Sequence, residues 1–353
     1  GNVSLNGSIT TSGAQTYKAD TILSGDTDIV TSGGDVTITG GTEGIYSAEV
    51  LPAGTGYNLS INSGSGNIIV GNETGFGNNN GTDALVNDLS LSSSTSTKIG
   101  SGSQSIGGEM AVPGGPLTLM GDTLLGGRSL VTPAGVDGAG HNLDLGFTEQ
   151  TTIDGNFTNI NNLKSSYSVA LEGGITTSGY QEYNASAVLV GNTTLQGTDL
   201  TFSNGLGGNG NNLDLNFSNT TFLNDNFANI ADLTSEGDVS LSGTITTSGS
   251  QDYKANANLT ADTTLQGDSL TFTNGVDGNS NNLDLNFSQT TSLDGSFTNI
   301  ADLTSEGNVS LNGSITTSGA QTYKADTILS GDTDIVTSGG DVTITGGTEG
   351  IYS

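Results

Sequence analysis

Apolar and polar residues alternate along most of the chain in short runs that are bounded by Gly, Asn or Asp. Examples are VSLSG from Val239, SLTFTNG from Ser269 and NLDLNF from Asn282. Alternation with a period of two residues over such short runs is typical of half-buried β-strands. No stretch has the apolar spacing of an amphipathic helix. The pattern therefore predicts an all-β protein with almost no helix.

A long tandem repeat organises these strands. Residues 307–353 are identical to residues 1–47, an offset of 306 residues. We interpret residues 1–306 as one repeat unit and residues 307–353 as the start of the next. Because the chain begins at Gly1 without Met, we expect it to be a segment of a longer protein, with one continuous rod over residues 1–353.

A shorter repeat recurs every 70 residues inside this unit. The tripeptide LDL begins at Leu143, Leu213 and Leu283, and the pentapeptide ITTSG keeps the same spacing. Several independent motifs in one register indicate a structural module. The predicted parts are modules at about 117–186, 187–256 and 257–326, and a divergent segment at 48–116 with an extra turn or loop.

Stacking of these modules predicts a β-solenoid. We group about nine short strands per module into three-sided coils of roughly 23 residues, so that one module makes three coils. Leu143, Leu213 and Leu283 then point into one core column. Few apolar residues suffice, because each coil is hydrogen-bonded to both neighbours and the core is thin. The predicted inward positions of one module are Val239, Leu241, Ile245, Leu259, Leu265, Leu270, Phe272, Leu283, Leu285, Phe287, Phe297 and Ile300.

Composition favours this solenoid over an ordinary globular domain. Hydrophobic residues make up 32% of the 353-residue chain, below the about 45–50% of globular proteins, and 56 residues are Gly. Intrinsic disorder is the alternative, but disordered acidic segments lack alternating runs. The chain has no Cys, so disulfides do not stabilise it.

The net charge narrows the range of partners. The chain has a formal net charge of −30. Nucleic acid requires a basic surface, so electrostatic binding to it is excluded. The same charge argues against docking on an anionic membrane, and no apolar run of about 18 residues is present to insert into one.

The phrase I-T-T-S-G-x-Q-x-Y, followed downstream by T-L-x-G, resembles the repeats of filamentous-haemagglutinin-like surface proteins. The resemblance covers residues 1–30 and 117–347. It implies a right-handed parallel β-helix and secretion to the bacterial cell surface. We therefore expect a structural repeat segment of a giant extracellular fibre or surface filament. The alternative is an adhesin stalk whose repeats bind glycan or another cell surface. The only Arg is followed by Ser-Leu, which excludes an Arg-Gly-Asp motif.

Calcium is the sharpest site hypothesis. The stretches DGAGHNLDL from Asp137 and DGNSNNLDL from Asp277 resemble the calcium-binding nonapeptide G-G-x-G-x-D-x-U-x. His141 or Asn281 stands where the nonapeptide has its ligand Asp, so an Asn-rich corner is the alternative. We expect no required cofactor, with calcium acting mostly as a diffuse counter-ion that could bridge neighbouring rods.

Enzymatic activity is not expected. Lyases acting on polyanions need basic residues, and the chain has six Lys and Arg in total. Frequent Asp residues recur once per module, which is typical of solvated corners. The divergent segment offers candidates for a lateral contact with parallel copies of the rod, with a covering loop as the alternative. These candidates are Val50, Leu51, Pro52 and Tyr57.

Overall fold

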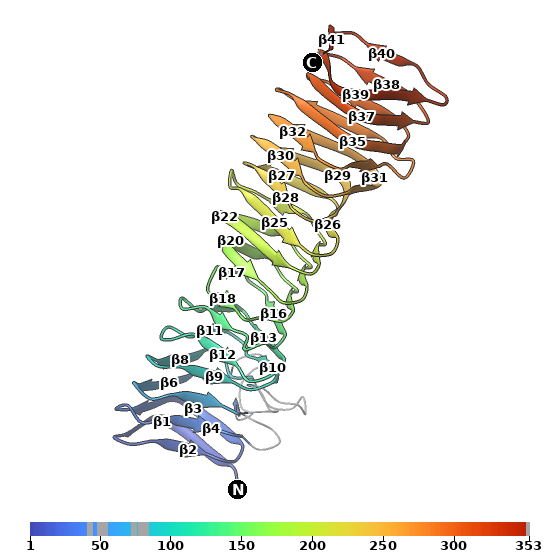
Figure 1. The fold of residues 1–353 in the computed structure, drawn as a ribbon. Helices are drawn as coiled ribbons and strands as arrows, with labels where there is room; N and C mark the ends of the chain where they lie inside the picture. The colour runs from blue at the N-terminus through green and yellow to red at the C-terminus, as the bar shows by residue number, and fades with distance from the viewer. Residues whose placement is uncertain (41–44, 48–55, 72–75, 77–84, 351–353) are drawn as a thin grey trace. The chain divides into compact units, whose positions relative to one another are not determined.

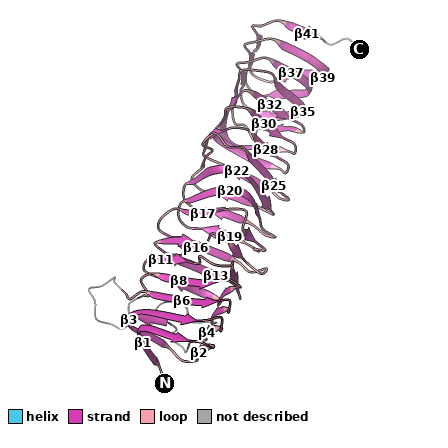
Figure 2. Cartoon of the chain, turned by 90° about the vertical axis from the view of Figure 1, so that its left-hand side faces the viewer, coloured by secondary structure: helices cyan, strands magenta, loops and turns pink. Residues whose placement is uncertain are grey.

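The computed structural model describes residues 1–40, 45–47, 56–71, 76 and 85–350. These residues are all-β and form parallel strands in stacked coils, a β-solenoid of about 16 turns. Figure 2 shows strands joined by loops, without a helix. None of the described residues therefore belongs to a helix of the length and apolarity needed to cross a bilayer. The prediction of a β-solenoid with almost no helix is confirmed.

The chain divides into two compact units. Unit 1 contains residues 1–170 and 175–180, and unit 2 contains residues 171–174 and 181–353. The strands before the division are β1 (Val3–Thr11), β2 (Gln15–Tyr17), β3 (Thr21–Thr31), β4 (Val36–Ile38), β5 (Ile45–Ser47), β6 (Leu59–Gly64), β7 (Ile68–Val70), β8 (Leu89–Ser93), β9 (Thr97–Ile99), β10 (Gly102–Ser105), β11 (Glu109–Ala111), β12 (Leu117–Leu119), β13 (Thr123–Gly127), β14 (Ser129–Val131), β15 (Val136–Asp137), β16 (Leu143–Phe147), β17 (Thr151–Ile153), β18 (Phe157–Thr158) and β19 (Leu163–Ser165), followed by β20 (Val169–Thr176), which contributes residues to both units.

Unit 2 contains all later strands, drawn from green to red in Figure 1. They are β21 (Gln181–Tyr183), β22 (Ala187–Gly197), β23 (Leu200–Phe202), β24 (Leu206–Gly207), β25 (Leu213–Phe217), β26 (Thr221–Leu223), β27 (Asn226–Ile230), β28 (Leu233–Ser235), β29 (Val239–Thr247), β30 (Ser250–Tyr253), β31 (Ala257–Gly267), β32 (Ser269–Phe272), β33 (Gly275–Asp277), β34 (Leu283–Phe287), β35 (Thr291–Ile300), β36 (Leu303–Ser305), β37 (Val309–Thr317), β38 (Gln321–Tyr323), β39 (Thr327–Thr337), β40 (Val342–Ile344) and β41 (Thr348–Gly350).

Three ladders of parallel pairs run through the coils of unit 2, and the chain visits them in turn. The first contains Leu200, Thr221, Val239, Ala257, Val276, Phe297, Ile315 and Ile335. The second contains Leu206, Phe227, Ile245, Leu265, Leu285, Ser305, Tyr323 and Ile344. The third contains Leu213, Leu233, Gln251, Leu270, Thr291, Val309, Thr327 and Thr348. Each coil therefore has three sides, as predicted.

The coils of unit 2 are shorter than the predicted roughly 23 residues. Partners in adjacent coils lie 17 to 21 residues apart in the sequence. Longer coils occur in unit 1, where Thr27 pairs with Leu59 and Leu59 pairs with Leu89. The predicted length is thus closer to an average than to the length of any coil in unit 2.

The prediction that Leu143, Leu213 and Leu283 share one core column is wrong. Leu213 belongs to the third ladder, whereas Leu283 pairs with Thr263 and Leu303 on the strands of the second. Eleven ladder steps separate Leu213 from Leu283, one step short of four coils. Because each side takes fewer residues than expected, a 70-residue module ends one side early. Equivalent motifs in unit 2 therefore lie on different sides of the coil.

The core of unit 2 lies inside the three ladders. All twelve inward positions predicted between Val239 and Ile300 are buried. Aromatic rings repeat at module spacing. The rings of Tyr253 and Phe272 stack with centroids 5.0 Å apart, and Phe297 meets Phe272 edge-on at 5.8 Å. Tyr183, Phe202 and Phe227 repeat this arrangement one module earlier.

An asparagine bulge explains the N/S-F-T/A-N-I motif. Phe297 and Ile300 are both buried although they lie three residues apart, which simple alternation does not allow. Asn299 between them adopts a left-handed φ of 53°, and the pairing register shifts between Phe297 and Ile300. Asn tolerates this conformation better than most residues. The bulge therefore lets both apolar side chains face the core.

Unit 1 has the same three-sided plan. One side contains β1, β3, β5, β6, β8, β11 and β14, a second contains β2, β4, β7, β9, β12, β15 and β18, and a third contains β10, β13, β16 and β19. Its coils lengthen in the divergent segment, where Ile68 follows its partner Val36 by 32 residues. Extra residues thus enter between strands while the parallel ladders continue on both sides of them.

The two identical 47-residue sequences fold alike, each within its own unit. Strands β1 to β4 and β37 to β40 begin and end at equivalent residues. Their registers also agree, since Val3 pairs with Thr21 and Val309 pairs with Thr327. Local sequence therefore determines both the strand boundaries and the pairing register of this segment.

Candidate functional site

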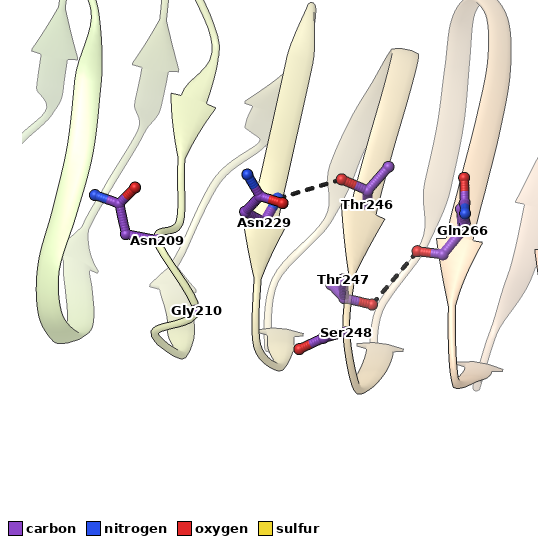
Figure 3. Close-up of a pocket in the computed structure, with 7 residues that line it drawn as sticks. All are labelled: Asn209, Gly210, Asn229, Thr246, Thr247, Ser248 and Gln266. Atoms are coloured by element: carbon purple, nitrogen blue, oxygen red, sulfur yellow. Dashed lines mark hydrogen bonds between the residues drawn. The ribbon is translucent and has the colours of Figure 1, made fainter.

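A polar groove on unit 2 is the most developed surface site among the described residues. It has a volume of about 590 Å³. Successive coils contribute its lining, and Figure 3 shows Asn209, Asn229, Thr246 and Gln266 in a row across them. The complete lining, which we call the amide groove, is Asn209, Gly210, Asn229, Thr246, Thr247, Ser248 and Gln266.

Hydrogen bonds between coils hold the row in place. The Asn229 backbone N–H donates to Thr246 Oγ1 at 3.3 Å, and the Gly210 N–H donates to the Asn229 carbonyl at 2.7 Å. Thr246 and Gln266 are direct partners in the ladder between β29 and β31. Asn209 and Asn229 both have left-handed φ angles, near 50° and 56°. The groove therefore rests on regular backbone pairing with two Asn residues at corner positions.

Charge distinguishes the amide groove from other surface hollows. None of its seven lining residues is ionisable, although the chain carries a formal net charge of −30. Three other grooves with described linings contain Asp277, Asp88 with Glu109 and Arg128, or Asp214 with Glu236 and Lys254. The amide groove therefore offers amides and hydroxyls to a ligand, without a fixed charge.

The two calcium candidates, Asp137 and Asp277, form Asn-rich corners. Asp277 Oδ1 accepts hydrogen bonds from the Asn279 backbone N–H at 3.1 Å and from Asn299 Nδ2 at 3.0 Å. Asp137 accepts equivalent bonds from Ala139 and Asn159. At the ligand position of the nonapeptide, the Asn281 amide donates to the carbonyls of Leu259 and Gly278.

The described residues contain no group of three or more His, Cys, Asp or Glu side chains placed to hold a metal ion. Asp137 and Asp277 are therefore not joined by further carboxylates into a cluster, and calcium binding stays a prediction. His141 lies 3.9 Å from Asp122, measured from Nδ1 to Oδ1.

Ladders of Asn and Asp line a corner of each unit. In unit 2, Asp262 accepts from the Asn282 N–H at 2.8 Å, and Asn282 Oδ1 accepts from the Asp302 N–H at 3.1 Å. Asp302 then accepts from the Ala320 N–H at 2.5 Å. These side chains replace backbone acceptors where the chain turns. Much of the Asn and Asp content thus serves the corners.

The few basic residues also bond between coils. Lys254 Nζ lies 2.5 Å from Glu236 Oε1, and Lys324 makes an equivalent pair with Glu306. The pKa of Lys254 is raised, chiefly by its hydrogen bond to Glu236. Both pairs are exposed, so they contribute little to stability.

The Q-x-Y part of the ITTSG motif forms a buried polar cluster. Gln251 is 1% exposed, and its Nε2 donates to the carbonyls of Ile245 at 3.2 Å and Gln266 at 2.9 Å. Its Oε1 accepts from the Tyr253 hydroxyl at 3.0 Å. Gln321 and Tyr323 repeat the cluster one module later. The motif is thus a structural device that satisfies carbonyls inside the coil.

This cluster makes stability sensitive to alkaline pH. Burial raises the pKa values of Tyr183, Tyr253 and Tyr323 above the usual 10.0. The unfolded chain ionises these hydroxyls from about pH 10, whereas the folded chain keeps them neutral. Their stabilising effect is complete below that pH and is lost as pH rises further, by about 1.4 kcal/mol per pH unit for each Tyr.

We therefore expect the free energy of unfolding to fall steeply above about pH 10 and the Tyr253→Phe variant to have a shallower slope. Denaturant unfolding at several pH values, with tyrosinate absorbance of the folded chain, measures both. Ionisation of all nine tyrosines at their ordinary pKa in folded protein would contradict the expectation.

Most of the predicted lateral-contact residues lie outside the description. Val50, Leu51 and Pro52 are not among the described residues. Tyr57 is half-buried; its backbone N–H donates to Ser47 Oγ at 2.7 Å, and its carbonyl accepts from the Asn87 N–H. A lateral contact between copies of the chain stays a prediction.

Sequence reasoning missed the amide groove. Its residues come from four coils and share no motif in the sequence. One signal was available: Gly207 stands where the other two modules have Asp137 and Asp277. Comparison of the chain with protein-family models, with curated proteins and with solved structures found no match.

Proposed function

We propose that this chain is a structural repeat segment of a giant extracellular bacterial fibre or surface filament. The observation that carries the proposal is the identical folding of residues 1–40 and their copy 306 residues later, each in its own unit. A sequence that specifies strand boundaries and register locally can be repeated without new interactions being invented for each copy.

The bonding between coils supports a mechanical role. Gln–Tyr clusters, Asn and Asp ladders and Lys–Glu pairs all join one coil to the next. These bonds recur at module spacing and add to the parallel backbone ladders. The extracellular bacterial location rests on the resemblance of the I-T-T-S-G-x-Q-x-Y phrase to surface-protein repeats. Calcium enters this proposal as a diffuse counter-ion to the acidic surface.

Labelling of intact cells tests the proposal. Antibodies raised against residues 187–326 are expected to decorate filaments outside the source cell at regular intervals in electron micrographs. Deleting one 306-residue unit from the gene should shorten every filament by the same increment. A deletion outside the repeats that leaves expression unchanged serves as the control. Antigen found only inside intact cells, or filaments of unchanged length, would refute the structural role.

A further inference from the structure

We propose that the amide groove of unit 2 binds a neutral, extended polysaccharide. This binding goes beyond the structural function proposed above and does not depend on it. The groove has a volume of about 590 Å³ and a lining of amides, hydroxyls and one glycine. Such groups donate and accept hydrogen bonds with sugar hydroxyls, and they do so without requiring a charged ligand.

Gly207 sets this module apart from its neighbours. The equivalent positions hold Asp137 and Asp277, and their carboxylates bind the side-chain amides of Asn159 and Asn299. Asn229 is the counterpart of these two Asn residues. Among the described residues no side-chain partner holds the Asn229 amide, because Gly207 provides no carboxylate. The substitution thus leaves one amide available and removes one negative charge from its neighbourhood.

The ends of the row are also particular to this module. Asn209 corresponds to Ala139 in the preceding module, and Gln266 corresponds to Val336 in the following one. Only the module of the amide groove therefore combines four hydrogen-bonding side chains in the row with a Gly at the Asp position. Asn209 Nδ2 donates to the Leu189 carbonyl at 3.0 Å, which fixes the orientation of the amide.

The spacing of the row suits a linear ligand. Asn209, Asn229, Thr246 and Gln266 come from successive coils, as Figure 3 shows. Parallel strands stack about 4.8 Å apart. This distance is close to the length of one sugar unit in an extended β-1,4-linked polysaccharide. One hydrogen-bonding side chain can therefore meet each successive sugar.

Charge selects a neutral ligand over an anionic one. The groove has no cation, and the whole chain is strongly acidic. A sulfated or carboxylated polysaccharide would be repelled and would find no Lys or Arg to compensate. The groove also has no aromatic side chain, so affinity must come from hydrogen bonds spread over several sugars.

The Gly207→Asp variant is the direct test, made in the full 353-residue chain. A Cβ at Gly207 would meet Val188 Cγ1 at 3.5 Å, an ordinary contact, and the chain already has Asp at both equivalent positions. The variant should therefore fold normally. We expect calorimetric titration with cellohexaose or chitohexaose to show binding to the parent chain, and the variant to bind at least about tenfold more weakly.

Asn216→Asp is the matched control, because it adds the same charge at an exposed position outside the amide groove. It should leave binding unchanged. The double variant Asn209→Ala with Gln266→Val copies residues found at equivalent positions, and it should also weaken binding. Circular dichroism checks that each variant folds. The proposal is overturned if neither neutral hexaose binds, if Gly207→Asp binds as well as the parent, or if a heparin hexasaccharide binds more tightly than both.

Discussion

Replacing Phe272 by Ala is expected to lower the free energy of unfolding of the surrounding coils by about 3–5 kcal/mol. Phe272 is fully buried, stacks on Tyr253 and meets the edge of Phe297. The substitution removes the middle ring of three and leaves a cavity that the parallel ladders on either side prevent from closing. It also removes two aromatic contacts, which add to the loss of buried area.

Amide hydrogen exchange in the full chain measures this effect, because it reports local opening in a repeat protein whose unfolding is not one transition. Amides of β30, β32 and β35 should lose protection most. Phe222→Ala is the control, since Phe222 is 38% exposed on the outer side of β26 and its loss should change stability by only about 0.5 kcal/mol. Equal effects of the two substitutions would show that the ring stack contributes nothing beyond surface packing.

The Gln251→Glu substitution is expected to destabilise the same region by about 3–5 kcal/mol at neutral pH. It keeps the shape of the side chain but places a carboxylate oxygen against two carbonyls that now accept from Nε2. Protonation of the new carboxyl restores one donor. Burial therefore raises the pKa of this Glu in the folded chain above its unfolded value of about 4.3.

The sign of the pH dependence follows from that shift. Stability is nearest to that of the parent below about pH 4, where the carboxyl is protonated in both states, and it falls as pH rises toward the folded pKa. Thermal unfolding of variant and parent between acid and neutral pH measures the difference. Gln289→Glu, at an exposed position, should show almost no such dependence. A Gln251→Glu penalty that does not change with pH would mean that the new carboxyl is solvated.

The alternating pattern was sufficient to predict the buried residues. Val239, Leu241 and Ile245 are buried as predicted, since alternate residues of a strand face opposite sides and only the inner side excludes water. The absence of helix, the three-sided coil and the equivalence of the identical segments followed from the same local information. The Q-x-Y motif was visible in the sequence, but its role was not, because its partners include a carbonyl 15 residues away.

Only the tertiary structure decided how coils align and where the surface site forms. The length of a coil depends on how tightly each corner turns, and bulges such as the one at Asn299 change it without changing the alternating pattern. For that reason, Leu213 and Leu283 occupy different sides despite their identical motifs. The amide groove depends on the same alignment, because stacking brings Asn229, Thr246 and Gln266 together from separate coils. Local sequence determines which residues face inward, whereas the register between coils determines which outward residues become neighbours.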